Sequence, residues 1–575
     1  MIYKIQAQRL NTLKQAKGYV MFLWHNHQPP LVSPGTKLQL QPYVRFHALR
    51  GYCDMPLWAK ESGIKVAFNL TPSLMEQLEL YTKGGTDPFL EHTLINAKKL
   101  STEQKQFILN NFFKTDFNLS ISPYPRYREL LTMKNRSRGT LTDFNFQDFL
   151  DLQVWFNLSM FGYGLRNENQ EIKGLIEKDR NFTEADKRKI INLQIKIIQG
   201  VLKNYRRLQE EGSISITVSP YVHPIIPLIV DQRIALEGMP GANLPQFSHP
   251  DDARAQFHLA GKIYERILGK PPLGMWPSEG SVCMEMFPLI SEALPTIEYL
   301  FTDADIRTKS DPPPESWWQK FVPWQIDKYR IFFRDRGLSD NIGFVQPERF
   351  FETAQDIYGN VIKIIEDSEL FGLKQKVIIP LVLDGENLQP SRPNDAYEFI
   401  HNLYSHFSRD ERIAAILPEE YLSLFPETLR LKRLFPGSWI GANFSTWTGD
   451  YKQSKGYRRI HRAENLLNDL KLKVELHYSP RQRETALEEI YSIAEKDNLF
   501  DAYSFLSPLA RAILLCLQAE SSCFRWWFGE KQGKTSDFRT FDQQFRALLA
   551  QGYGELGMEV PKQLGASLYE IFKKI

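Results

Sequence analysis

Seven short apolar runs of strand length mark the first 400 or so residues, and segments with helical spacing separate most of them. The runs cover residues 18–24, 64–70, 213–219, 272–279, 298–303, 330–335 and 377–384. Near-continuous apolar strands that alternate with helices are typical of a parallel sheet covered by helices. The pattern therefore predicts an α/β barrel, with the parallel sheet inside and the helices outside.

The remaining sequence is mostly helical in pattern. Residues 73–212 are long and polar, and segments such as 184–211 carry apolar residues at helical spacing, so we interpret this stretch as a helical insertion. After residue 400 the stretches 463–474, 483–496 and 506–518 suit the helices of a bundle. We therefore predict a catalytic barrel over residues 1–405, including the insertion, and a C-terminal helical domain over residues 406–575.

Polar side chains cluster where the predicted strands end. In α/β barrels the catalytic groups gather at the carboxyl ends of the strands. Structural polar residues would have no reason to share this position, so we interpret the group as a candidate active site. Its members are His25, His27, His223, Glu279, Asp303, Arg334, Asp335, Asp384 and Glu386.

Two carboxylates of this group suggest a specific chemistry. Glu279 follows Trp276 near the end of the fourth predicted strand, and Asp384 ends the seventh. Cleavage of a glycosidic bond needs one carboxylate that attacks the sugar carbon and one acid that protonates the leaving oxygen. Each acid alone could equally cap a helix or close a turn. Their pairing favours the catalytic interpretation.

Aromatic residues make up 13% of the chain, and two aromatic islands lie in its helical tail. Residues 437–450 contain Trp439 and Trp447 among turn-forming residues, and residues 521–530 contain Trp526 and Trp527. Ring faces stack on sugars in carbohydrate sites, but rings in loops also plug hydrophobic cores. Both interpretations stay open at this point, and the tail is expected to carry these rings to the active-site cleft.

The charge balance and the cysteines exclude several classes of function. Lys plus Arg number 71 against 68 Asp plus Glu, a net charge of +3 that gives no reason to expect a nucleic-acid or membrane partner. The four cysteines form no CxxC pair, which argues against a zinc knuckle. We expect no cofactor and no metal ion. Without an apolar leader or a membrane-length run we predict a cytoplasmic location, while the oligomeric state is open.

Five ordered motifs resemble the signature regions of glycoside hydrolase family 57, within it most closely the α-amylase and amylopullulanase branch. They are His25-Asn-His27-Gln-Pro, Ser219-Pro-Tyr-Val-His223-Pro, Trp276-Pro-Ser-Glu279-Gly-Ser-Val, Asp384-Gly-Glu386-Asn and Ser438-Trp-Ile…Asn-Phe…Trp447-Thr-Gly. The resemblance implies an incomplete seven-stranded (β/α)7 barrel with a helical C-terminal part. It also implies a retaining double displacement on α-glucans or maltooligosaccharides, at α-1,4 linkages and with α-1,6 linkages as a further candidate.

The same resemblance implies roles for individual residues. Glu279 matches the family's nucleophile and Asp384 its general acid/base. The three histidines match residues that line the subsite of the attacked sugar. The remaining candidate substrate-binding residues are Trp276, Asp303, Arg334, Asp335, Glu386, Trp439, Trp447, Trp526 and Trp527. The sequence departs from the family pattern at 388–393, at Cys283 and at the basic stretch 452–459.

The mechanism requires Glu279 to be ionised and Asp384 to hold a proton, which proximity and burial can achieve. Arg334 is expected either to influence the ionisation of Glu279 or to pair with Asp335.

Three alternatives stay open. The same site could transfer glucan chains, as a 4-α-glucanotransferase or a branching enzyme does. The histidines could hold a metal, as in carbohydrate deacetylases or zinc mannosidases on similar barrels. A glucan-binding protein without catalysis is the third alternative.

Overall fold

The computed structural model of the chain describes residues 7–136, 140–344, 353–371, 376–449, 455–529 and 535–569. Its centre is a sheet in which ten strands are described, in the order β10-β6-β7-β5-β4-β3-β2-β1-β8, with β9 paired to the start of β1. All seven predicted strands are present and parallel. They are β1 (Gly18–Asn26), β2 (Val66–Leu70), β3 (Ile214–Val218), β4 (Gly274–Met275), β5 (Tyr299–Asp303), β7 (Tyr329–Arg334) and β8 (Ile378–Asp384). The predicted α/β class is confirmed.

Alternating side chains of the strands pack into two layers, as the pleat of a strand requires. In β1, Met21 and Leu23 point to the cluster inside the barrel, while Phe22 and Trp24 point to the larger cluster between the sheet and its outer helices. Both layers are buried, which explains why these strands are apolar at every position. Pairing aligns His25 with Asp384 of the neighbouring strand, so the polar strand ends share one edge of the sheet.

The barrel is incomplete because β7 and β8 are not paired as a ladder. One backbone hydrogen bond joins them beyond the end of β7, from the N–H of Asp335 to the carbonyl of Pro380 at 2.9 Å. Pro380 faces this seam and has no N–H to donate in return. The N–H of Val382 is engaged by the Ser339 hydroxyl at 3.2 Å instead. The seam is therefore held by isolated contacts, consistent with the incomplete barrel that the resemblance implied.

Three short strands were not predicted: β6 (Trp324–Ile326), which is antiparallel to β7, β9 (Ile413–Ala415) and β10 (Leu429–Arg430). The last two lie beyond residue 405, where the sequence predicted the helical part to begin, and they join the sheet. The helices around the barrel are α1 (Ala7–Gln15), α2 (Tyr43–Ala48), α3 (Gly51–Glu61), α4 (Pro72–Thr82), α12 (Ile226–Val230), α13 (Pro250–Leu268), α14 (Met286–Ala293), α15 (Ala304–Lys309), α16 (Arg336–Gly343), α17 (Ala354–Glu369), α18 (Tyr397–Arg409) and α19 (Pro418–Leu424).

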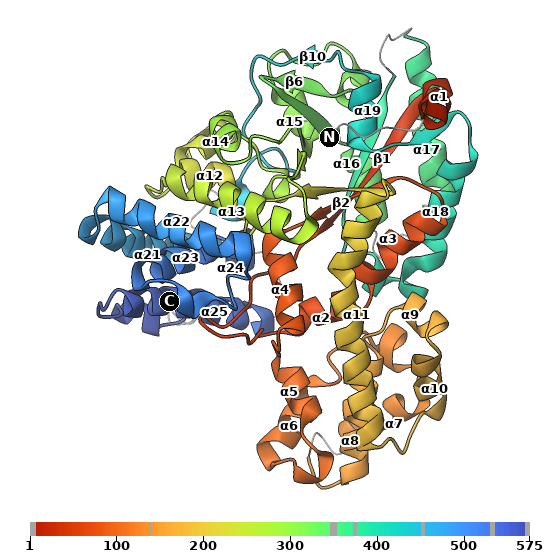
Figure 1. The fold of residues 1–575 in the computed structure, drawn as a ribbon, viewed down its shortest axis with the longest axis vertical. Helices are drawn as coiled ribbons and strands as arrows, with labels where there is room; N and C mark the ends of the chain where they lie inside the picture. The colour runs from red at the N-terminus through yellow and green to blue at the C-terminus, as the bar shows by residue number, and fades with distance from the viewer. Residues whose placement is uncertain are drawn as a thin grey trace.

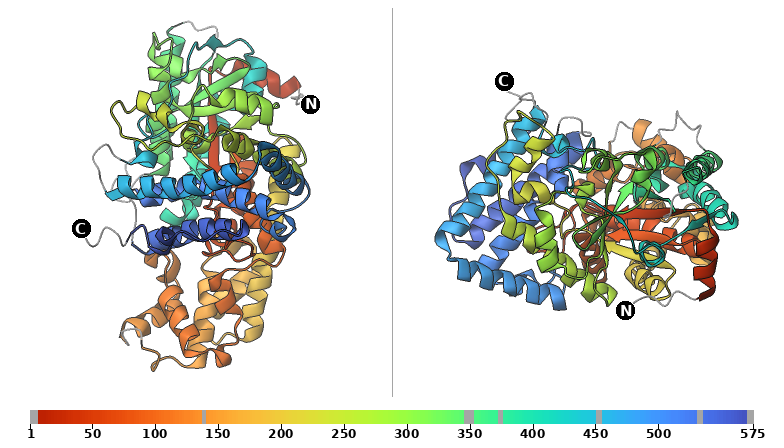
Figure 2. Two further views of the ribbon diagram at one scale, coloured as in Figure 1. Left: turned by 90° about the vertical axis from the view of Figure 1, so that its left-hand side faces the viewer. Right: turned by 90° about the horizontal axis from the view of Figure 1, so that it is seen from above.

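The inserted helices project from the barrel as a lobe, and the long α11 runs from this lobe back to the sheet (Figure 1). These helices are α5 (Pro88–Leu94), α6 (Thr102–Asn111), α7 (Pro125–Arg136), α8 (Phe146–Leu158), α9 (Tyr163–Glu168), α10 (Gln170–Lys178) and α11 (Glu184–Glu210). The C-terminal helices pack on one side of the barrel, as the right-hand view in Figure 2 shows. They are α20 (Ser445–Thr448), α21 (Lys455–His477), α22 (Pro480–Lys496), α23 (Pro508–Ala519), α24 (Ser522–Phe528) and α25 (Thr535–Glu555).

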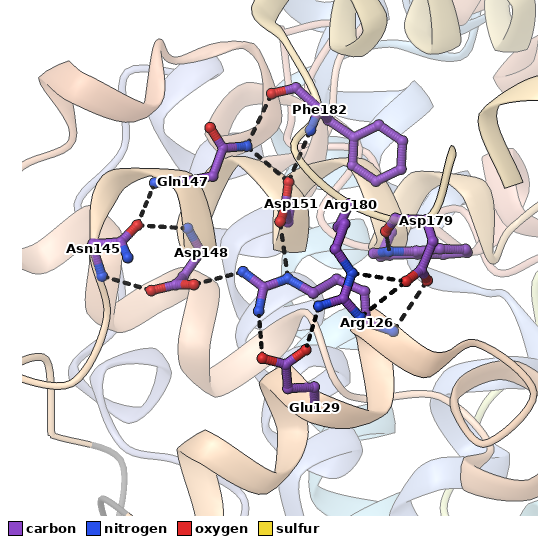
Figure 3. A network of polar contacts seen from close by, with 10 residues as sticks. Arg126, Glu129, Asn145, Gln147, Asp148, Asp151, Asp179, Arg180 and Phe182 are labelled. Carbon is purple, nitrogen blue, oxygen red and sulfur yellow. Dashed lines mark hydrogen bonds and ion pairs between the residues drawn. The ribbon is translucent and has the colours of Figure 1, made fainter. Parts of the chain in front are cut away.

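A charged network fastens the lobe internally (Figure 3). The guanidinium of Arg126 on α7 binds Asp148 at 2.5 Å and Asp151 at 2.9 Å, both on α8. Asp151 is fully buried and also accepts from the N–H of Phe182 at 3.0 Å. The network thus ties α7, α8 and the turn before α11 into one unit. No helix of the described chain is long and apolar enough to cross a membrane.

Candidate active site

Glu279 occupies a strained position beyond the end of β4. It lies in the short 3-10 turn η4 (Ser278–Gly280) with a left-handed φ of 59°, which is uncommon for a residue other than glycine. The following residue, Gly280, has a φ of +57°, and a Cβ there would lie 2.9 Å from the ring of Trp276. The N–H of Trp439 donates to the Glu279 carbonyl at 3.0 Å. These constraints fix the direction of the Glu279 side chain.

The Glu279 carboxyl is largely enclosed, with 18% of its side chain exposed. Its Oε2 accepts a hydrogen bond from the indole Nε1 of Trp439 at 2.9 Å, and its Oε1 lies 3.8 Å from Nδ1 of His223. Burial, followed by the negative charge of Asp384, raises the pKa of Glu279 to about 8, while the indole hydrogen bond lowers it. The two carboxylates that the sequence paired therefore interact electrostatically in one site.

Asp384 ends β8, and its Oδ2 accepts from Nδ2 of Asn387 at 3.0 Å. Burial raises its pKa to about 6, although the positive charge of Arg334 opposes that shift. Burial and repulsion thus raise the pKa of Glu279 above that of Asp384, so the proton in the substrate-free site favours Glu279. The sequence predicted the opposite order. The negative charge of Asp384 beside Glu279 and the cation Arg334 beside Asp384 explain the difference.

Arg334 does not pair with Asp335, so that prediction is wrong. Its guanidinium donates to Asp303 at 3.3 Å, to the Val382 carbonyl at 3.0 Å and to Asp340. The guanidinium also lies 4.9 Å from the centre of the Trp439 ring. It therefore bridges the open seam of the barrel and supports both catalytic candidates.

The two aspartates of this group act as helix caps. Asp303 is fully buried and accepts from the Asp305 N–H at 2.9 Å at the start of α15. Asp335 accepts from the Leu338 N–H at 3.0 Å at the start of α16, and Lys320 approaches it at 3.2 Å. Both carboxylates are engaged within the protein, which argues against the substrate contacts expected of them.

Three histidines from β1 and from the loop after β3 stack face to face. His223 lies 4.2 Å from His27 and 4.8 Å from His25 between ring centres, with interplanar angles near 20°. Burial lowers the pKa of His25 to about 4 and holds the pKa values of His27 and His223 well below their usual range. All three rings are thus neutral at physiological pH. The structure brings together the histidines that the resemblance assigned to one subsite.

Stacked rings direct their nitrogen lone pairs along parallel planes and not toward a common point. This arrangement does not suit the metal site considered for the deacetylase-like alternative. Across the described residues, no group of three or more His, Cys, Asp or Glu side chains is arranged to hold a metal ion.

Glu386 faces the same site from the loop after β8. Its Oε1 accepts from the His27 N–H at 2.8 Å and from the Tyr52 hydroxyl. Burial raises the pKa of Glu386 to about 8, and its bond from Tyr52 opposes this shift. Glu386 is therefore placed to fix the end of β1 that carries the histidines.

The tryptophans divide into two classes by burial. Trp276 and Trp447 are fully buried, Trp276 inside the barrel and Trp447 in a separate apolar cluster with Leu228 of α12, which argues against sugar stacking by either ring. Trp439 is half-buried and packs edge-on against Trp276 at 5.6 Å. Trp526 and Trp527 are also half-buried, and Trp527 stacks on Phe541 at 5.0 Å. The ends of the two aromatic islands, residues 450 and 530, and the first part of the basic stretch, residues 452–454, lie outside the described residues.

Several contacts to the histidines come from residues that the sequence analysis missed. The amide oxygen Oδ1 of Asn69 accepts a hydrogen bond from Nδ1 of His25 at 2.7 Å, and the Thr71 hydroxyl contacts Nδ1 of His27 at 3.3 Å. Both could have been predicted, because β2 ends at Leu70 and functional groups of α/β barrels gather at the carboxyl ends of the strands. Ser522 and Cys523 also reach the imidazoles, and no local pattern indicated this, because they lie about 300 to 500 residues away in the chain.

Comparisons with known proteins agree with this geometry. The sequence profile described as Glycosyl hydrolase family 57 matches residues 21–432. The fold is similar to a GH57-type branching enzyme from Pyrococcus horikoshii (TM-score 0.53, 15% identity, 97% of this chain and 94% of that one). It is also similar to a GH57 branching enzyme from Thermococcus kodakaraensis (TM-score 0.52, 15% identity, 96% of this chain and 94% of that one). A third similar structure is the α-amylase AmyC from Thermotoga maritima (TM-score 0.54, 13% identity, 95% of each chain). No functionally curated protein matches the sequence.

Proposed function

The chain belongs to glycosyl hydrolase family 57, and from this premise we propose that it is a retaining glycosidase that acts on α-glucans or maltooligosaccharides. Glu279 is the nucleophile and Asp384 the general acid/base. The observation that carries the proposal is the placement of these two carboxyls, one just beyond β4 and one at the end of β8, where the charge of Asp384 acts on Glu279. Double displacement requires two carboxyls that share one sugar-sized site.

In the first step, a carboxylate oxygen of Glu279 forms a bond to the anomeric carbon while the glycosidic bond breaks. Asp384 gives its proton to the leaving oxygen, and an ester between Glu279 and the sugar results. In the second step, Asp384 takes a proton from water, and the water oxygen displaces Glu279 from the anomeric carbon. The configuration is inverted twice and is therefore retained overall.

The proton of the free site favours Glu279, so substrate binding has to redistribute it. A sugar hydroxyl that donates to Glu279 would favour its ionised form, as the Trp439 indole already does. Transfer of the single proton to Asp384 then gives the reactive pair. Once the ester forms, Glu279 no longer carries a negative charge. Its repulsion of a second carboxylate is therefore absent, and Asp384 can ionise and act as the base.

The neutral imidazole stack suits an uncharged sugar. His25, His27 and His223 can exchange hydrogen bonds with hydroxyl groups without placing a buried positive charge beside the oxocarbenium-like transition state. Trp439 is half-buried and holds the Glu279 carboxyl through its indole N–H, which makes it a further candidate to contact the same sugar. Trp526 and Trp527 are candidates for more distant subsites.

Product analysis on amylose, pullulan and maltooligosaccharides tests the proposal. Hydrolysis of amylose would release new reducing ends, and cleavage of pullulan would place α-1,6 linkages within the specificity. The first product should have the α configuration when followed by NMR from the start of the reaction, and Glu279→Gln should reduce turnover by at least about 10³-fold. A β product would contradict retention, and full activity of Glu279→Gln would remove it as nucleophile.

Transfer to another glucan chain is the second candidate, because two similar structures are those of branching enzymes. It would appear in the same experiment as new branch points or redistributed chain lengths without a matching rise in reducing ends.

A further inference from the structure

Residues 521–523 of the helical tail lie directly against the imidazole stack. Ser521 forms an isolated β-bridge with Pro224, and the N–H of Ser522 donates to the His223 carbonyl at 3.0 Å. The Ser522 hydroxyl lies 3.0 Å from Nδ1 of His223. A backbone contact and a side-chain contact thus hold the same histidine from the opposite part of the chain.

This double contact acts on a strained residue. His223 has a φ of 61°, a left-handed conformation that non-glycine residues adopt only when the surrounding structure enforces it. Its ring is almost completely buried, and within the described part of the chain its Nε2 has no hydrogen-bond partner. A buried polar atom of this kind is costly unless a ligand satisfies it.

Cys523 makes the corresponding contact to the second ring. Its Sγ lies 3.0 Å from Nε2 of His27, while Thr71 faces Nδ1 of the same ring at 3.3 Å. Burial, followed by the charge of Glu279, raises the pKa of the Cys523 thiol to about 12, so the sulfur carries its proton. A protonated thiol is a weak donor, and a neutral imidazole nitrogen accepts from it.

We propose that Ser522 and Cys523 are positioning residues that fix the tautomers of His223 and His27 and thereby set the hydrogen-bonding pattern of the subsite. The Ser522 hydroxyl donates to Nδ1 of His223, which leaves the ring proton on the unpartnered Nε2 as a donor to a sugar oxygen. The Cys523 thiol donates to Nε2 of His27, which leaves the proton on Nδ1 to face Thr71. The identity of the recognised group as a sugar oxygen rests on the proposed function, whereas the two tautomers do not.

NMR of the full-length protein labelled with ¹⁵N-histidine tests the tautomers without substrate. Long-range ¹H–¹⁵N correlations distinguish a protonated Nε2 from a protonated Nδ1, and His223→Gln and His27→Gln spectra assign the signals. We expect the Nε2–H form for His223 and the Nδ1–H form for His27, with the first lost in Ser522→Ala and the second in Cys523→Ala. Opposite tautomers in the wild type, or unchanged ones in these variants, would overturn the proposal.

Kinetics on an α-glucan supply the second readout. Ser522→Ala and Cys523→Ala should each lower kcat/KM about tenfold, as expected for loss of one buried hydrogen bond. The donor-preserving variants Ser522→Thr and Cys523→Ser should recover most of it. Cys516→Ser, a buried thiol on the neighbouring α23, is the matched control and should stay within about twofold of wild type.

Two further outcomes separate this inference from the proposed function. Wild-type protein that is inactive on every α-glucan, with the expected tautomers present, would contradict the proposed function and still support the positioning roles of Ser522 and Cys523. The opposite outcome is that the alanine variants lose activity only in proportion to a lower Tm, that the expected tautomers are absent, and that Ser522→Thr and Cys523→Ser do not recover activity. This outcome would mean a structural role and overturn the inference.

Discussion

The indole Nε1 of Trp439 donates a 2.9 Å hydrogen bond to Oε2 of Glu279. The two residues are 160 positions apart, and a backbone bond from the Trp439 N–H to the Glu279 carbonyl reinforces their contact. The indole stabilises the ionised carboxylate against the burial that raises the pKa of Glu279. This single contact thus links the segment after the barrel to the ionisation state of the proposed nucleophile.

Replacing Trp439 with Phe should raise the pKa of Glu279 further, because the ring stays while the donor is lost. A hydrogen bond to a charged group contributes about 1.5–3 kcal/mol, so we expect kcat/KM to fall roughly 10- to 100-fold. The alkaline limb of the pH profile should move to higher pH. Trp276→Phe is the matched control, since its buried Nε1 has no partner among the described residues. It should lower Tm without moving that limb, and an unmoved limb in Trp439→Phe would contradict the assignment.

The pH dependence of kcat/KM should be bell-shaped. The active free enzyme carries one proton on the coupled pair, whose pKa values are about 6 for Asp384 and about 8 for Glu279. Below the lower value both carboxyls are protonated and the nucleophile is lost. Above the higher value both are ionised and the acid is lost. Initial rates measured from pH 4 to pH 10 would check this. A kcat/KM that stays constant below pH 6 and above pH 8 would argue against a shared proton.

The sequence was sufficient for the barrel strands and for placing the proposed catalytic pair at the strand ends. Buried parallel strands leave continuous apolar runs, and polar groups that follow such runs share one edge of the sheet, so Glu279 and Asp384 could be selected as candidates before the structure was known. Strands β6, β9 and β10 were missed because two or three residues are too few to show a period. Their pairing depends on the neighbouring strand and not on their own composition.

The aromatic residues show where sequence reasoning ends. Trp439 and Trp447 belong to one turn-rich island, yet one is half-buried beside Glu279 and the other is sealed in a core. The residue type and the spacing are the same for both outcomes, because an indole suits a core and a sugar platform equally. Burial is decided by which helices pack on the island. Contacts such as Cys523 with His27 depend on the same tertiary packing.

The Arg126 network predicts a local determinant of stability in the lobe. Arg126→Met leaves the buried Asp148 and Asp151 without their cation, which typically costs about 3–5 kcal/mol. Urea unfolding would measure this. Arg180→Met is the control, because Arg180 is 47% exposed and its ion pairs should contribute less than about 1 kcal/mol. Equal losses in the two variants would show that the burial of the aspartates is not the cause.

The histidine stack should make the fold sensitive to acid. Burial lowers the pKa of His25 from 6.5 to about 4, so the folded state keeps this ring neutral while the unfolded chain takes up a proton. The stabilising contribution is complete above pH 6.5 and is lost as the pH falls toward 4, at about 1.4 kcal/mol for each unit of pKa difference. Calorimetry should therefore show a smaller decrease in Tm between pH 6.5 and pH 4 for His25→Gln than for the wild type. His477 is exposed, so His477→Gln is the control and should show the same decrease as the wild type. Parallel curves for all three proteins would mean that the buried stack does not control acid stability.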